Sequence, residues 1–275
     1  MNTSNFMKSF FTAVLLGVAF TLHAQKSEPV IVRCGTTANF ETASDNYNVD
    51  IIGKWHNDVL DQLLLQGREY NICLKDRDFL TKFNTLYRNY FATKGIIMDS
   101  RGGAITADPQ QIKDYYDSYD VNSSGYSGDA LAFLLELKQK QEEYNSKGIT
   151  LDDFSNYCDQ KQAQIALLGD PVEAKAIGVV FSVAKHSEEY WAANTQAFID
   201  KFGANGCSEG ITHCGTTARR VPWGGIAYAD VSGAINGGRI GAVAAGGIPG
   251  AVAGGLMGAG ISSGLRVLSF AIFGD

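Results

Sequence analysis

Small residues recur at every fourth position through the last fifty residues, and this pattern constrains the fold more than any other feature. The first series consists of Gly225, Ala229, Gly233, Gly237, Gly241 and Ala245. After a shift of one position, the second consists of Gly246, Gly250, Gly254, Gly258 and Ser262. Residues four apart lie on one face of a helix, so each series predicts a helix with a face of small side chains. The GxxxG spacing of this glycine zipper allows close approach of a second helix.

The two series predict a helical hairpin over residues 223–275. Residues 246–249 are expected to form the turn, with Pro249 placed to begin the second helix. No charged residue lies between Arg239 and Arg266, a run long enough to cross a bilayer as one helix. Trp223, Arg239 and Arg266 are residue types that suit a membrane interface.

Two environments explain such a hairpin. In lipid, close packing through glycine is a favoured way for helices to associate. In water, the hairpin would dock on the apolar faces of the preceding helices or on a partner helix, including that of a second copy. Asp230 and Arg239 make permanent spanning costly, because a central charge costs roughly 2.5–3.5 kcal/mol on insertion scales. Conditional membrane insertion or tight self-association is therefore favoured over a permanent span.

The N-terminus predicts export to the periplasm or the medium. Lys8 precedes an apolar and small-residue run, Ser9 to Leu22, which is typical of a signal peptide cleaved after Ala24. The full chain has 23 basic and 29 acidic residues and a net charge of −6, and loss of Lys8 would change it to −7. A negative chain without a basic run is a poor candidate for binding nucleic acid.

An oxidising compartment would permit disulfides among the five cysteines, which are Cys34, Cys73, Cys158, Cys207 and Cys214. A small Cys207–Cys214 loop is preferred over a zinc site that adds His213, because a fourth ligand is not evident. Cys34 and Cys214 each begin a Cys-Gly-Thr-Thr sequence, which makes them a further candidate pair. Cys73 and Cys158 are interpreted either as a second bridge or as two buried thiols.

Residues 50–202 show helical periodicity throughout. Apolar stripes predict helices that end near Gly67, Gly95, Gly148, Gly169 and Gly203. Helix starts are expected at Asp108 with Pro109, at Thr150 with Asp153 as a variant capping box, and at Asp170 with Pro171. The fold class is therefore all-α. The expected organisation is a signal peptide (1–24), a helical bundle (25–205), a cysteine-containing linker (206–222) and the hairpin (223–275).

Catalytic residues are not evident. His56 lies near Asp58 and Asp61 and could serve as a general base, but a hydrogen bond within the bundle is the preferred interpretation. His186 is placed on a polar, solvated side of the last bundle helix. No nucleotide-binding, metal-protease or nucleophile motif occurs, so the chain is expected to be non-enzymatic, without a cofactor, metal ion or small-molecule substrate.

Two resemblances add to this interpretation. The tail, with its glycines from Gly225 to Gly258, resembles class II, two-peptide-type bacteriocins, which implies glycine-rich helices that insert into target membranes. The His56-Asn57 pair, Ser187, Trp191 and the tail together are similar to a group of secreted bacterial helical proteins, which implies a shared fold and compartment without an activity. The expected function is membrane association or close helix packing by the hairpin. The alternative is a soluble structural or interaction protein with the hairpin docked on its own body.

Overall fold

The computed structural model describes residues 33–34, 49–66, 79–93, 96–97, 114, 118–202, 223–242 and 247–273. Within these ranges the protein is all-α, as predicted. The elements in chain order are β1 (Arg33–Cys34), α3 (Asp50–Gln66), α4 (Phe79–Thr93), β2 (Ile96–Ile97), the 3-10 turn η1 (Val121–Ser124), α6 (Gly128–Asn145), α7 (Leu151–Ile165), α8 (Pro171–Phe202), α9 (Trp223–Gly241) and α10 (Gly247–Phe273). The two-residue strands β1 and β2 pair antiparallel.

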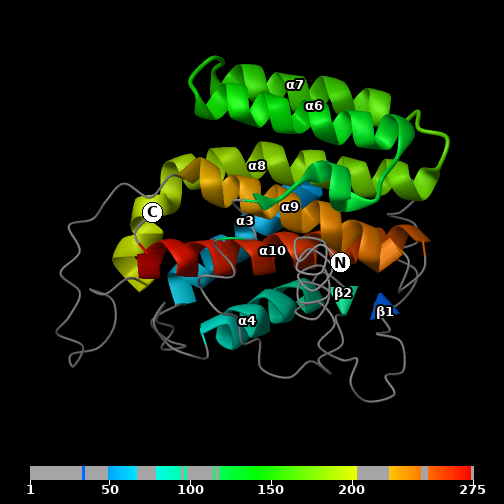
Figure 1. Ribbon diagram of the computed structural model, residues 1–275. Coiled ribbons are helices and arrows are strands. Elements are labelled where there is room, and N and C mark those ends of the chain that lie inside the picture. The colour runs from blue at the N-terminus through cyan, green and yellow to red at the C-terminus, as the bar shows by residue number, and fades with distance from the viewer. Residues whose placement is uncertain are drawn as a thin grey trace, which may run out of the picture.

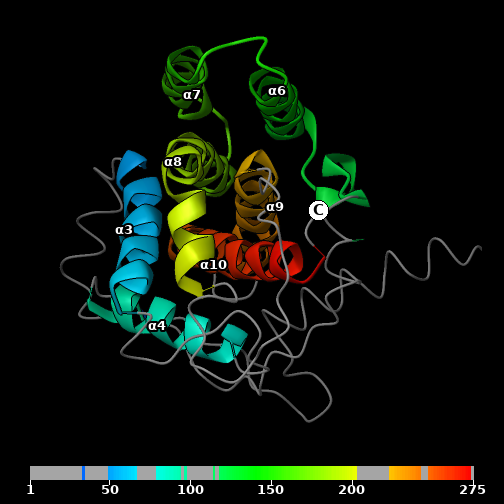
Figure 2. The ribbon, with the colours of Figure 1, turned by 90° about the vertical axis from the view of Figure 1, so that its left-hand side faces the viewer.

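The helices form layers around α8 and α10 (Figure 1). The α6–α7 pair covers one side of α8, while α3 and α9 flank α8 in the next layer, as Figure 2 shows. Helix α10 contacts α9, α8 and α3, and α4 covers α10 on the side away from α6 and α7. The C-terminal helices therefore lie in the middle of the protein.

Local sequence signals explain where α7 and α8 begin. The Thr150 side chain accepts from the backbone N–H of Asp153, and the Asp153 carboxylate accepts from the backbone N–H of Thr150, which is a complete capping box. Asp170 directly precedes Pro171, the first residue of α8, and its carboxylate accepts from the backbone N–H of Val172 at 2.7 Å. Both starts agree with the sequence prediction.

Helices α9 and α10 run antiparallel and meet through glycine. A Cβ atom at Gly233, Gly237 or Gly241 would collide with the backbone of a glycine on α10. The opposing residues are Gly258, Gly254 and Gly250, respectively, so three successive turns of each helix are in backbone contact. The absence of side chains at these positions is therefore what permits the close approach.

Helix α10 uses glycine on further faces as well. The ring of Tyr87 on α4 occupies the space where Gly260 would carry a Cβ, and the Phe83 ring lies over Gly264. The Tyr87 hydroxyl donates to the backbone carbonyl of Leu256 at 2.5 Å. Aromatic side chains of α4 thus fill the space that glycine leaves on α10.

The uncharged run between Arg239 and Arg266 does not form one helix, because α9 ends at Gly241 and α10 begins at Gly247. None of the helices within the described ranges combines the length and the apolar character needed to cross a membrane.

Candidate functional site

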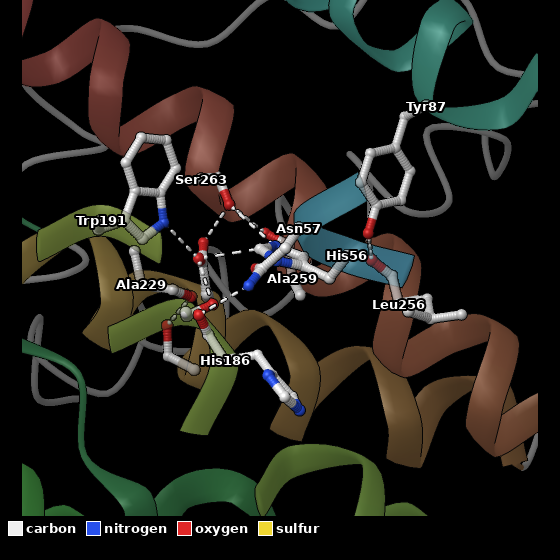
Figure 3. A network of polar contacts seen from close by, with 12 residues as sticks. His56, Asn57, Tyr87, His186, Trp191, Ala229, Leu256, Ala259 and Ser263 are labelled. Carbon is white, nitrogen blue, oxygen red and sulfur yellow. Dashed lines mark hydrogen bonds and ion pairs between the residues drawn. The ribbon is translucent and has the colours of Figure 1, made fainter. Parts of the chain in front are cut away.

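Polar side chains from four helices meet at one buried point in the middle of the protein (Figure 3). His56 comes from α3, Ser187 and Trp191 from α8, Asp230 from α9 and Ser263 from α10. All five are completely buried. Burial of a carboxyl group is costly unless donors and an opposite charge surround it, so this cluster is the candidate site.

Asp230 is the centre of the cluster. Its Oδ2 accepts from the Ser187 hydroxyl and from the Trp191 indole N–H, each at 2.8 Å. Its Oδ1 accepts from the Ser263 hydroxyl. An indole nitrogen can only donate, so the oxygen it faces must remain an acceptor. The carboxyl of Asp230 therefore connects α8, α9 and α10 through three hydrogen bonds.

The ring of His56 is oriented by Asn57. The Asn57 amide donates to the backbone carbonyl of His186 at 2.8 Å, which leaves its Oδ1 as the acceptor 3.3 Å from Nδ1 of His56. Nδ1 therefore carries a hydrogen. The other ring nitrogen, Nε2, lies 3.3 Å from the Ser263 hydroxyl oxygen and 3.6 Å from Oδ2 of Asp230. Nε2 therefore faces the serine hydroxyl and the carboxyl group together.

Burial dominates the electrostatics of Asp230. Loss of hydration raises its pKa, while the nearby His56 and the hydrogen bonds from Ser263, Trp191 and Ser187 oppose the rise without cancelling it. The negative charge of Asp230 in turn adds to the burial that raises the pKa of Tyr87 on α4. A single carboxyl therefore influences residues on several neighbouring helices.

Serine, histidine and aspartate are the residue types of a hydrolase triad, but their arrangement here is different. In a triad the carboxylate and the serine face opposite nitrogens of the imidazole. Here Asp230 and Ser263 both face Nε2, and all three side chains are completely buried. The cluster therefore lacks the order of contacts of a triad, and its hydrogen bonds join neighbouring helices.

A second set of polar contacts joins α3 to α8. Asp50, at the start of α3, lies 2.7 Å from Nε2 of His186 and 3.4 Å from Nζ of Lys185. One turn later, the backbone N–H of Gly53 donates to the Ser182 hydroxyl at 2.8 Å, and a Cβ at Gly53 would collide with the Ser182 carbonyl. Asn57, which bonds to the His186 carbonyl, continues this line.

The structure revises both histidine predictions. His56 does bond within the bundle, but its carboxylate partner is Asp230, more than a hundred residues away, and Asp58 instead accepts from Tyr90 at 2.8 Å. The expectation that His186 lies on a solvated face is wrong, because His186 is buried against Asp50.

The three residues expected at a membrane interface have different surroundings. Trp223 begins α9. The guanidinium of Arg239 donates to the backbone carbonyl of Ser124 at 2.7 Å and lies over the Tyr126 ring. Arg266 is half-buried on α10.

Of the cysteines, Cys158 is a free and completely buried thiol, which is one of the two alternatives left open for it. Cys34 lies in β1, whereas Cys73, Cys207 and Cys214 fall outside the described residues, as do Gly246 and residues 1–24, where a signal peptide is expected. Among the described residues no group of three histidine, cysteine, aspartate or glutamate side chains could hold a metal ion.

Sequence reasoning missed the role of Asp230 and of two other buried polar residues, Gln141 and Glu188. One signal was available: Asp230 is the single acid in an otherwise uncharged, small-residue segment that reaches to Arg239. An acid in that position indicates a buried partner, although it does not identify which residue supplies it.

No family model matches the chain. The searches of curated proteins and of solved structures found no match either.

Proposed function

We propose that this chain is a non-enzymatic structural or interaction protein in which the α9–α10 pair is docked within its own helical body. One observation carries the proposal: no residue of α10 from Ala251 to Val267 is exposed. A helix that serves as a free membrane or partner surface would keep an accessible face.

The contacts on α10 explain how it stays docked. One face meets α9 through glycine, another receives Tyr87 and Phe83 from α4, and Gly255 contacts Val179 of α8. Each glycine in a helix costs about 1 kcal/mol relative to alanine. Dense contacts with three neighbouring helices offset this cost in water, because dispersion and apolar burial increase with close approach.

Flotation with lipid vesicles tests the proposal, using the protein with and without residues 223–275. We expect the intact protein to stay in solution. We expect the truncated protein to aggregate, because Val179 and the donors of Ser187 and Trp191 would lose the helices that cover them. A truncated protein that stays monomeric and equally stable would contradict the docked arrangement.

The second candidate is membrane association after the pair leaves the body. It is favoured by the direct backbone contacts between the glycines of α9 and α10, in which the other helices take no part. Gly237→Leu and Gly254→Leu would then abolish vesicle leakage, while circular dichroism would show that most of the helical content is retained. Leakage equal to that of the parent protein would eliminate this candidate.

Export to the periplasm or the medium is part of the proposal and rests on residues 1–24. Cell fractionation of a tagged protein, with and without these residues, tests it. A partner of this protein would be another protein or a lipid surface, since the negative net charge of −6 disfavours nucleic acid.

A further inference from the structure

A second buried carboxyl lies one residue beyond Ser187 and faces the opposite layer. Glu188 on α8 is completely buried, and so is Gln141 on α6, which it contacts. The Gln141 amide Nε2 donates to Oε1 of Glu188 at 2.9 Å. This bond is a direct polar link between the α6–α7 layer and α8, separate from the Asp230 cluster.

If Glu188 is ionised, the second oxygen of its carboxylate and the amide oxygen of Gln141 cannot hydrogen-bond to each other, because both only accept. Oε2 of Glu188 and Oε1 of Gln141 are both buried, both are acceptors, and neither has a hydrogen-bond partner. Leaving buried polar atoms unsatisfied costs on the order of 1–3 kcal/mol each. A carboxylic acid resolves the mismatch, since its hydroxyl can donate to the amide oxygen.

We propose that Glu188 and Gln141 form a proton-binding site in which the neutral acid and the amide exchange two hydrogen bonds. The Gln141 N–H donates to Oε1 of Glu188, and the bound proton on Oε2 donates to Oε1 of Gln141. The site takes one proton per molecule, and its occupancy controls how firmly the α6–α7 layer is held on α8. Both hydrogen bonds join α6 to α8, and neither of these helices belongs to the α9–α10 pair.

The surrounding charges agree with a neutral Glu188. The α9 residue that acts on Glu188 is Asp230, a second carboxyl. Tyr144 of α6 and Cys158 of α7 lie on the other sides, and the charge of an ionised Glu188 adds to the burial that raises the pKa of each. From α3, His56 lies against Asp230, and α10 contributes the uncharged Ser263 at that cluster.

Burial raises the pKa of Glu188 to about 8, with a further increase from Asp230 and an opposing effect of the Gln141 hydrogen bond. Because this value is above the ordinary one of 4.5, the folded state retains a proton that the unfolded state releases. The stabilisation is complete below about pH 4.5 and is lost as the pH rises toward about 8. Deprotonation then leaves an uncompensated charge and two opposed acceptors between α6 and α8.

Two measurements on the intact chain test the site. First, unfolding equilibria are compared between the parent and Glu188→Gln, which is neutral at every pH and can form the same two hydrogen bonds with Gln141. The ratio of the parent's unfolding constant to that of the variant should rise about tenfold per pH unit between about pH 5 and pH 8. Glu189→Gln is the matched control, since Glu189 is the next residue of α8 and is exposed.

A flat ratio for Glu188→Gln, or an equal slope for Glu189→Gln, would overturn the proposal. Second, the carboxyl carbon of Glu188 in the folded parent is titrated by NMR, which does not depend on whether the variant folds. A midpoint near 8 supports the site. A midpoint near 4.5 would mean that Glu188 is ionised at neutral pH and that a water or another group satisfies the two oxygens.

Discussion

Nε2 of His56 lies 3.6 Å from Oδ2 of Asp230, and neither side chain has any exposed surface. These residues are on α3 and α9, and Ser187, Trp191 and Ser263 add donors to the same carboxyl. The position of the C-terminal helix pair in the body therefore depends on a buried carboxyl group as well as on shape.

Asp230→Asn should lower the free energy of unfolding by about 3 kcal/mol, because the amide NH2 group cannot accept from the buried donors that meet one of the two carboxyl oxygens. Urea unfolding measures the loss, and a double-mutant cycle with His56→Leu should give a coupling of about 0.5–3 kcal/mol. Asp200→Asn, at an exposed carboxylate of α8, is the control and should change stability by no more than about 0.5 kcal/mol. A coupling near zero would show that the two residues act independently.

Gly237→Ala and its neighbour Gly238→Ala should have opposite effects. A methyl group at Gly237 collides with the Gly254 backbone, so we expect a loss of about 1–3 kcal/mol. At Gly238 the nearest atom, the Ala251 carbonyl oxygen, would lie 3.5 Å from the new Cβ, and better helix propensity should add up to about 1 kcal/mol. Thermal unfolding should show a lower midpoint for Gly237→Ala than for the parent and a higher one for Gly238→Ala. If both variants gain stability, α9 and α10 are not in backbone contact in solution.

Asp50 should make stability depend on acid pH. Burial alone would raise its pKa, but hydrogen bonds from Lys54 and His186 and the charges of His186 and Lys185 outweigh this and hold the pKa well below its usual value. The stabilisation is present above about pH 4 and is lost as the pH falls further. The parent should therefore exceed Asp50→Asn in stability at neutral pH, and the difference should shrink below about pH 4. A difference that stays constant down to pH 2 would contradict the ion-pair explanation.

Cys158 should resist alkylation in the folded protein. The thiol is completely buried, and burial raises its pKa, so little reactive thiolate forms. The protein is treated with iodoacetamide without a reductant, either folded or unfolded, and its peptides are analysed by mass spectrometry. Cys158 should be unmodified in the folded sample and modified in the unfolded one. Modification that requires a reductant as well would instead mean that Cys158 forms a disulfide.

The sequence predicted the helical class and several helix starts because those signals are local. Thr150 with Asp153, and Asp170 with Pro171, act within one turn of chain. The spacing of glycine along residues 225–258 was likewise readable, although it could not reveal which helices would face those glycines. That depends on tertiary packing, as the contacts of Gly260 with Tyr87 illustrate.

The candidate site could not be predicted in the same way. His56 was recognised as bonding within the bundle, but its contacts with Asp230 and Ser263 bring together segments that are far apart in the chain. Sequence neighbours such as Asp58 were the only visible candidates, and α3 directs that side chain toward Tyr90 instead. The polar neighbours of His186 in the sequence, Ser187 and Glu188, indicate a solvated face, but both are buried in the structure, and so is His186.

The hydrogen bonds of α3 and α4 to α10 have a consequence for how the chain folds. His56 and Ser263 are 207 positions apart, and Tyr87 and Leu256 are 169 apart. Contacts with such long separations slow folding, since the entropy lost in bringing distant segments together precedes the energy that the contact supplies. Helices α3 and α4 therefore cannot reach their final environment until α10 has been synthesised. A nascent chain would remain incompletely folded until α10 emerges, the condition in which a polypeptide can still be threaded through a narrow channel.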